Sequence, residues 1–165
     1  MRTMIVSMHP QVQLITSDLF AAVLEQAGRS PRRRTNFNFH PGLEDNPHRL
    51  LNVMLEGTYI QPHRHLDPPK SETFLVLEGK AVIFLFDDEG RVTHRHTLGP
   101  GAEALGIDLA PGVWHSLAVP SAHAICFEVK PGPYTQATDK EFAPWAPREG
   151  DPGAAEYLRR LLDSP

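Results

Sequence analysis

Cysteine, basic charge and long apolar runs are all scarce in this chain of 165 residues. The single cysteine, Cys126, excludes an internal disulfide and a zinc site built from cysteines. Lysine and arginine number 16 against 20 aspartates and glutamates, and the formal charge of -4 argues against nucleic acid as a partner. No apolar stretch approaches the roughly 18 residues that a membrane span needs, and the N-terminal residues are too polar for a signal peptide. We therefore expect a cytoplasmic protein that binds neither nucleic acid nor membranes.

Proline, glycine and histidine, in contrast, are plentiful. The 16 prolines and 12 glycines interrupt the chain every few residues, which favours many short strands over long helices. The length fits a single domain over residues 1–165 and is sufficient to bury a full core.

The N-terminal part predicts one helix and one strand. Ser17 is a suitable N-cap, and apolar residues then recur at helical spacing until Gly28, which predicts a helix of about ten residues. Residues 34–40 alternate strictly between a polar and an apolar face, which is typical of a half-buried strand. The polar face has two interpretations, a solvent-facing edge or the wall of a pocket in which arginine holds a phosphate or carboxylate. Its residues are Arg34, Asn36, Asn38 and His40.

From residue 49 to residue 130 the sequence predicts consecutive short strands. The segments are 50–55, 58–61, 72–77, 81–86, 91–98, 104–109, 114–119 and 122–129, with a hairpin turn at 87–90. Strands at this spacing favour a β-sandwich or barrel. A short helix is predicted over 154–162. The chain thus divides into an N-terminal helix and strand extension (1–48), a barrel (49–132) and a C-terminal extension (133–165).

Two of the nine histidines lie one residue apart in an extended segment. In a strand, His63 and His65 point to the same side, about 7 Å apart along the backbone, and can converge on one cation. Glu72 opens the next predicted strand and can add a carboxylate, and His115 follows the tight turn at 111–112. The other histidines outside the polar stripe, including a second His-x-His pair, are interpreted as structural or exposed: His9, His48, His94, His96 and His123.

The order of these residues resembles the two cupin motifs. Gly57, His63, His65, Glu72 and Gly79 match the first motif, and Pro111, Gly112 and His115 match the second. The resemblance covers residues 50–130 and implies an all-β double-stranded β-helix, the cupin jelly-roll barrel. It also implies that His63, His65, Glu72 and His115 bind one divalent transition metal per chain: iron, manganese, nickel, cobalt or zinc.

One departure from the first motif leaves two candidates for the carboxylate ligand. Six residues separate His65 from Glu72, where three or four are commoner, and Asp67 in the added loop is a rival ligand. Glu72 is preferred because its distance to Gly79 fits the motif and because it opens a strand.

Nearly the whole chain is similar to one group of cupins, the WbuC-type metalloproteins, which are named from bacterial O-antigen gene clusters. The similar strings include Pro-His-Arg-His at 62–65, Gly-Val-Trp-His at 112–115 and Phe-Ala-Pro-Trp-Ala-Pro at 142–147. This similarity implies a role in surface polysaccharide (lipopolysaccharide) biosynthesis, with a small sugar-like or sugar-acid-like molecule as ligand.

Two functional classes follow from a metal site of this kind. We favour an enzyme, whose chemistry could be isomerisation, epimerisation, a lyase reaction or dioxygenation; the alternative is a non-catalytic module that binds or senses a small molecule. A homodimer is left open. The candidates for contact with the small molecule are Arg34, Asn36, His40, Gln61 and Trp114. Packing is the competing interpretation for Trp114.

Overall fold

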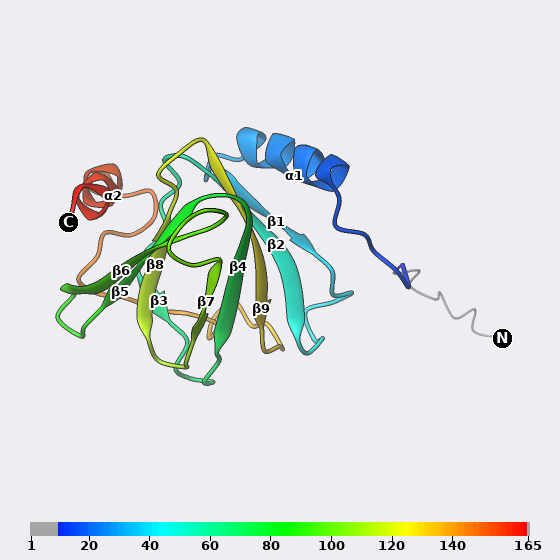
Figure 1. The fold of residues 1–165 in the computed structure, drawn as a ribbon. Helices are drawn as coiled ribbons and strands as arrows, with labels where there is room; N and C mark the ends of the chain where they lie inside the picture. The colour runs from blue at the N-terminus through cyan, green and yellow to red at the C-terminus, as the bar shows by residue number, and fades with distance from the viewer. Residues whose placement is uncertain (1–9, 165) are drawn as a thin grey trace.

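The computed structural model describes residues 10–164 as two five-stranded antiparallel sheets that face each other, with a helix on the outside of each (Figure 1). The first sheet has the order β1 (Arg34–Asn38), β2 (His48–Leu55), β9 (His123–Lys130), β4 (Glu72–Gly79) and β7 (Gly106–Leu109). The second has the order β10 (Glu141–Phe142), β3 (His63–Arg64), β8 (Trp114–Ala118), β5 (Ala81–Phe86) and β6 (Val92–Leu98).

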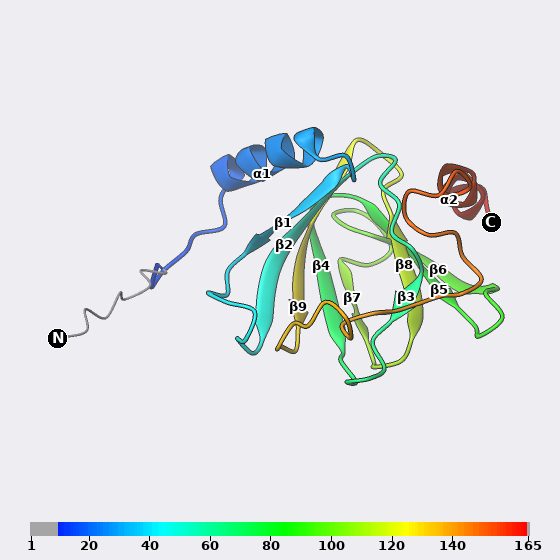
Figure 2. The ribbon, with the colours of Figure 1, turned by 180° about the vertical axis from the view of Figure 1, so that it is seen from behind.

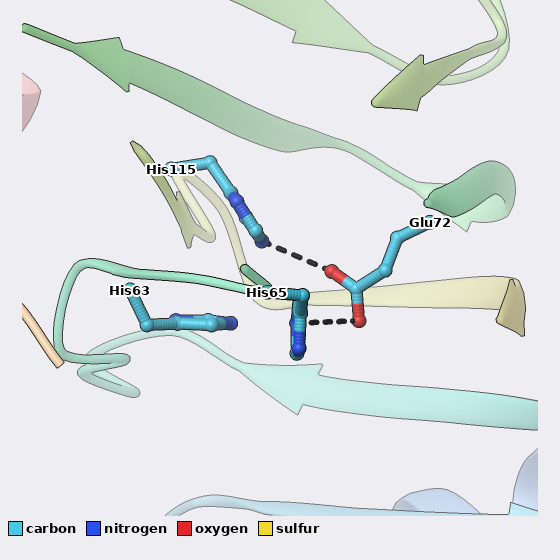
Figure 3. A group of neighbouring side chains, drawn as sticks. All are labelled: His63, His65, Glu72 and His115. Atoms are coloured by element: carbon cyan, nitrogen blue, oxygen red, sulfur yellow. Dashed lines mark ion pairs between the residues drawn. The ribbon is translucent and has the colours of Figure 1, made fainter. Parts of the chain in front are cut away.

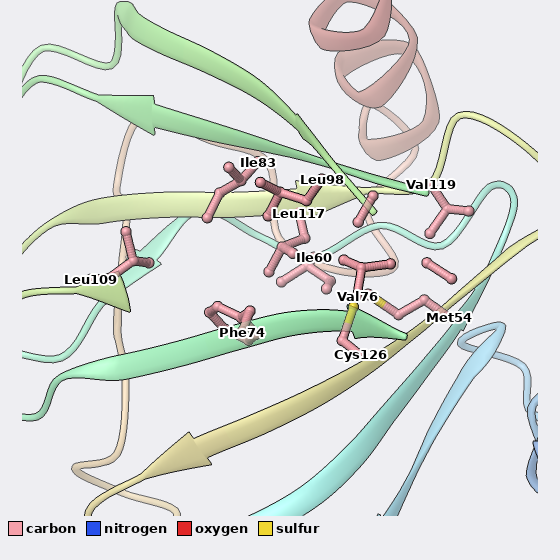
Figure 4. Close-up of a cluster of buried hydrophobic side chains, with 12 residues drawn as sticks. Met54, Ile60, Phe74, Val76, Ile83, Leu98, Leu109, Leu117, Val119 and Cys126 are labelled. Carbon is pink, nitrogen blue, oxygen red and sulfur yellow. The ribbon is translucent and has the colours of Figure 1, made fainter. Parts of the chain in front are cut away.

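The space between the sheets is apolar at one end and polar at the other. Inward-facing side chains of both sheets form the apolar core, with Met54, Phe74, Ile83, Leu117 and Cys126 among its members (Figure 4). Because side chains alternate between the two faces of a strand, every second residue beyond this core also points inward. On β9 the residues that follow Cys126 on that face are Glu128 and Lys130, and both are buried. The polar end of the barrel is therefore built from the same strand faces as its apolar core.

Helix α1 (Ser17–Arg29) covers the outer face of the first sheet at β1 and β2. Its buried residues Val23 and Ala27 pack on the outward-facing side chains of those strands. The expected N-cap at Ser17 is wrong by one residue: Thr16 is the cap, and its hydroxyl accepts a hydrogen bond from the backbone N–H of Leu19.

Helix α2 (Ala154–Asp163) packs on the outer face of the second sheet (Figure 2). Leu158 and Leu161 contact the cluster formed by the outward-facing side chains of β5 and β8. Each sheet is thus buried on both faces over part of its area, which explains strands as apolar as β5.

The strands predicted from sequence are present with small shifts in their ends, except for 58–61, where the prediction is wrong. The backbone carbonyls there bond to side chains instead of a neighbouring strand: Ile60 accepts from the Ser116 hydroxyl at 2.6 Å and Tyr59 accepts from Arg34 at 3.0 Å. The two-residue strands β3 and β10, which pair with each other, were not predicted. His40 lies beyond the end of β1.

Within residues 10–164, no helix is long and apolar enough to cross a membrane.

Candidate metal centre

Four buried side chains from both sheets meet at one point between them (Figure 3). His63 on β3 pairs in register with His115 on β8, His65 follows β3, and Glu72 begins β4 in the facing sheet. One ligand atom from each residue lies within 4.8 Å of the others. The structure therefore brings together all four residues that the sequence proposed as ligands. Asp67, the rival carboxylate, is exposed in the loop before β4 and is not part of the group.

Each of the three imidazoles is oriented by a backbone carbonyl. Nδ1 of His63 lies 2.9 Å from the Gln61 carbonyl, and Nδ1 of His115 lies 2.9 Å from the Val113 carbonyl. Nδ1 of His65 contacts the Asp139 carbonyl. Because a carbonyl only accepts hydrogen bonds, these contacts place the proton on Nδ1 and leave the lone pair of each Nε2 directed at the centre.

The Glu72 carboxylate faces two of these lone pairs. Its oxygens lie 3.0 Å from Nε2 of His65 and 3.0 Å from Nε2 of His115, and both pairs are ionic only if the imidazole is protonated. With the proton on Nδ1, each Nε2 is a hydrogen-bond acceptor and faces a carboxylate oxygen, which is also an acceptor. Both Nε2 atoms and Oε2 of Glu72 are therefore buried without a hydrogen-bond partner. A divalent cation at the centre would satisfy all of these atoms at once. The donor set, three nitrogens and a carboxylate, suits the first-row transition metals.

Electrostatics keep the ligands in the forms that bind a metal. Burial, together with the nearby Lys140 ammonium, holds the pKa of His63 well below its ordinary value, which favours the neutral ring. Burial alone would raise the pKa of Glu72; without a metal, hydrogen bonds from His115 and His65, which require a proton on Nε2, and the charge of Lys130 outweigh burial and hold that pKa well below the usual range.

A buried charge network that the sequence did not predict extends from Glu72. Nζ of Lys130 lies 3.5 Å from Oε1 of Glu72 and 3.2 Å from Asp139, whose carboxylate also pairs with Lys70 at 2.9 Å. Charged residues near the end of a predicted strand, such as Glu128 and Lys130, are expected at the surface; here that expectation is wrong, because both are buried and face the barrel interior. Their spacing of two and four residues from the core residue Cys126 was the available signal.

A polar cavity of about 570 Å³ opens beside the centre. It is lined by inward-facing side chains of β1, β2 and β9 and by the segment after β9, and Lys130 links it to Glu72. Three of the proposed contact residues, Arg34, Asn36 and Gln61, lie on its wall. Further lining residues that the sequence did not single out include Asn52, Glu128 and Lys140.

Both terminal nitrogens of Arg34 are engaged by protein partners at the cavity wall. Its guanidinium pairs with Glu149 at 2.6 Å and donates to the Thr58 hydroxyl at 3.2 Å and to the Tyr59 carbonyl at 3.0 Å. These contacts join β1 to the segment that precedes α2, so the visible role of Arg34 is to hold the wall together.

The other two proposed contact residues lie away from the cavity. His40 is buried against His48, with ring centroids 4.0 Å apart, and its Nδ1 bonds to the backbone of Arg49. Trp114 occupies the opposite face of β8 from His115, where its Nε1 donates to Asp88 at 2.9 Å and the Arg64 guanidinium lies 4.2 Å above its ring. For both residues the structure shows packing.

The remaining histidines stand apart from the metal centre. His94 and His96 lie on β6, and His96 pairs with Glu103 at 2.9 Å. His123 pairs with Glu78 at 2.9 Å. His9 lies outside the described residues.

Solved structures with a similar fold place these observations in context. CapF, a capsular polysaccharide assembling protein from Staphylococcus aureus, superposes with a TM-score of 0.55 at 20% identity over 68% of this chain and 32% of that one. Protein SO0799 from Shewanella oneidensis superposes with a TM-score of 0.52 at 14% identity, over 78% of this chain and 85% of that one. The chain spans about a third of the length of the CapF chain that it matches. The shared fold confirms the expected cupin jelly-roll barrel.

A sequence family also matches. A family described as a domain of unknown function, DUF6016, matches residues 15–98, slightly more than half of the 165 residues. The matched stretch runs from α1 to the end of β6 and includes His63, His65 and Glu72. This cupin-fold chain therefore belongs to the DUF6016 family.

Proposed function

We propose that this protein is a metal-dependent enzyme that acts on a small polar molecule, sugar-like or sugar-acid-like, in surface polysaccharide synthesis. One observation carries the proposal: three carbonyl-anchored imidazoles and a carboxylate converge beside a polar cavity of about 570 Å³. Cavities of this size accommodate small-molecule ligands. When bound by four protein ligands, a divalent transition metal polarises a hydroxyl or carbonyl oxygen of a small molecule.

The cavity wall supplies a group suited to proton transfer. Burial and the nearby Glu72 charge raise the pKa of Glu128. At a given pH, a larger fraction of Glu128 is therefore protonated than of an ordinary glutamate. Asn52 donates to Oε2 of Glu128 at 3.1 Å and fixes the carboxyl group against the wall. A metal centre with a neighbouring carboxyl group favours catalysis over passive binding.

Support for the polysaccharide context comes from two directions. The chain resembles the WbuC-type cupins in the strings around His63, His115 and Trp145. The similar fold of CapF, named as a capsular polysaccharide assembling protein, agrees with that context.

Metal analysis of the purified protein is the first test. We expect close to one divalent transition metal per chain, and we expect His63→Ala and His115→Ala each to abolish most of it. The control is His94→Ala, which removes an exposed histidine of the other His-x-His pair and should leave the metal content unchanged. Equal loss in the control would mean that the metal resides elsewhere.

A screen of sugars, sugar acids and sugar phosphates with the loaded protein then separates an enzyme from a binding module. Turnover that disappears in His115→Ala would support the enzyme. Saturable binding with no turnover for any compound would favour the sensing module.

A further inference from the structure

One basic side chain on the cavity wall has no carboxylate of the described residues within ion-pair distance to supply a counter-charge. Arg32 and Arg34 both pair with Glu149 at 2.6 Å, and Lys130 lies 3.2 Å from Asp139. Lys140 also lines the cavity, yet among residues 10–164 no carboxylate lies within 4 Å of it and no hydrogen bond reaches its ammonium.

The sequence neighbours of Lys140 cannot supply that counter-charge. The Asp139 carboxylate is held by Lys70 at 2.9 Å and by Lys130 at 3.2 Å. The Glu141 carboxylate turns to the outside of the barrel and binds Arg64 at 2.8 Å. Among residues 139–141, Lys140 therefore lines the cavity without an ion-pair partner within the part of the chain that the structure describes.

Lys140 is not an ordinary solvated surface lysine. It is half-buried on the cavity wall, and its charge acts on both His63 and Glu72 of the metal centre. Burial and the nearby Lys130 ammonium lower its pKa, and the charges of Glu72, Glu128 and Asp139 offset this only in part, which leaves a deficit of stabilising interactions for its positive charge. An anion in the cavity would remove that deficit.

A second unsatisfied atom lies on the same wall. Oδ1 of Asn52 is buried without a hydrogen-bond partner, while Nδ2 of the same side chain donates to Glu128. A buried acceptor of this kind is costly unless a donor such as a hydroxyl group reaches it. The wall thus offers the unpaired ammonium of Lys140 to an anionic group and the Asn52 oxygen to a hydroxyl group.

We propose that the cavity binds a hydroxylated organic anion, with its carboxylate or phosphate group on Lys140 and a hydroxyl group on Asn52. This inference rests on the proposed function and narrows its substrate class from polar molecules in general to hydroxy acids or sugar phosphates. A neutral sugar would leave the Lys140 charge uncompensated.

The test compares three probes with related carbon skeletons. D-gluconate carries a carboxylate, D-glucose 6-phosphate carries a phosphate, and D-glucose is neutral. Calorimetric titration of the wild-type protein should show binding of at least one anion, at least about tenfold tighter than that of glucose. The stronger of the two anions identifies the anionic group.

Variants at Lys140 assign the effect to this residue. Lys140→Met should weaken binding of that anion at least about tenfold, whereas Lys140→Arg, which keeps the charge, should recover most of it. Lys80→Met is the matched control, because Lys80 is exposed and does not line the cavity, and it should bind like the wild type. The inference is overturned if neither anion binds better than glucose, or if Lys140→Met binds the anion as tightly as Lys80→Met does.

Measurement in metal-free and metal-loaded protein separates this inference from the proposed function. Lys140-dependent anion binding in a protein that takes up no metal would contradict the metal-dependent enzyme and leave the inference standing. Stoichiometric metal uptake with anion binding indifferent to Lys140 would contradict only the inference.

Discussion

Glu72 supplies the carboxylate of the metal centre, and its side chain contacts two imidazoles at once. Its two carboxylate oxygens each lie 3.0 Å from a different Nε2, of His65 and of His115. The exposed Asp67, five residues earlier, has no such contact. The charge of a single side chain therefore balances much of the charge of a bound cation.

Replacing Glu72 with glutamine keeps the shape of the side chain and removes this charge. We expect Glu72→Gln to lower metal affinity at least about tenfold, because a neutral amide is a poorer ligand for a divalent ion. Competition with a chromophoric chelator measures the affinity. Asp67→Asn should leave it unchanged, and the reverse order of the two variants would show that the loop supplies the ligand.

The lowered pKa of His63 makes the stability of the metal-free protein depend on pH. Its folded-state pKa lies well below its ordinary value of 6.5, so as pH falls through about 6.5 the unfolded chain takes up a proton that the folded chain does not bind. The free energy of unfolding should therefore fall between about pH 6.5 and pH 5 and show no penalty from this residue above about pH 7.

Melting temperatures of the metal-free wild type and of His63→Asn across this range measure the effect. The variant lacks the titrating ring, so its melting temperature should fall less on acidification. Identical pH profiles for the two proteins would mean that His63 is protonated as readily in the fold as in the unfolded chain.

At this scale the sequence predicted the ligands better than their surroundings. His63, His65, Glu72 and His115 were identified because their order along the chain carries a signal. Asp139 and Lys130 were not, since their pairing depends on how residues 131–140 return across the barrel end. A contact between segments so arranged leaves no local pattern in the sequence.

Among the elements, the short segment 139–142 contributes more than its length suggests. Strand β10 pairs with β3 through Glu141 and Phe142, and the Asp139 carbonyl orients His65. The Asp139 side chain is 2% exposed and stands between Lys70 and Lys130. This segment closes the barrel at the metal centre.

Loss of the Asp139 carboxylate should be far more costly than loss of its neighbour's. Asp139→Ala leaves two buried ammonium groups without their shared partner, and we expect a loss of about 3–5 kcal/mol in the free energy of unfolding. Glu141→Ala breaks an ion pair with Arg64 in which Glu141 is 48% exposed, and it should cost no more than about 1 kcal/mol. Urea denaturation distinguishes the two, and similar losses would contradict the buried network.

Gly79, at the end of β4, is required for two reasons that can be separated. Its φ of 73° is unfavourable for other residues, and a Cβ atom there would lie 2.0 Å from the His123 carbonyl oxygen. Gly101 has the same φ of 73° but no atom within 4 Å of a Cβ.

Alanine substitutions at these two glycines therefore isolate the steric contact from the backbone strain. Gly101→Ala should cost about 1–2 kcal/mol from strain alone, and Gly79→Ala should cost clearly more, since β4 and β9 must also separate. Chemical denaturation measures both, and equal costs would mean that the sheet yields at Gly79 without loss.

The elements themselves were largely predictable. Alternating and apolar runs predicted strands such as β5 and β9, and helical spacing predicted α1 and α2. The two-residue strands β3 and β10 are too short for any periodicity, and they exist because residues far apart in sequence meet. At 58–61 the composition favoured a strand, but side-chain donors took the carbonyls that a ladder would use.

For the whole molecule, the segment that follows α1 and the segment that precedes α2 meet at the cavity wall. The guanidinium groups of Arg32 and Arg34, before and on β1, share Glu149, which precedes α2. Helices α1 and α2 pack on opposite sheets, so this shared carboxylate links the N-terminal and C-terminal segments across the barrel end. Sequence composition had indicated two extensions without indicating that they meet.

The reactivity of the single cysteine can report how often the barrel of this protein opens. Cys126 is 0% exposed in the core, and burial raises the pKa of its thiol to about 12. A disulfide reagent added to the folded protein should therefore react only in molecules whose barrel has opened, and the rate of the colour change counts those openings. A metal that binds only the closed barrel should slow this reaction by the factor 1 + [metal]/Kd, so thiol exchange reports occupancy of a site that contains no sulfur.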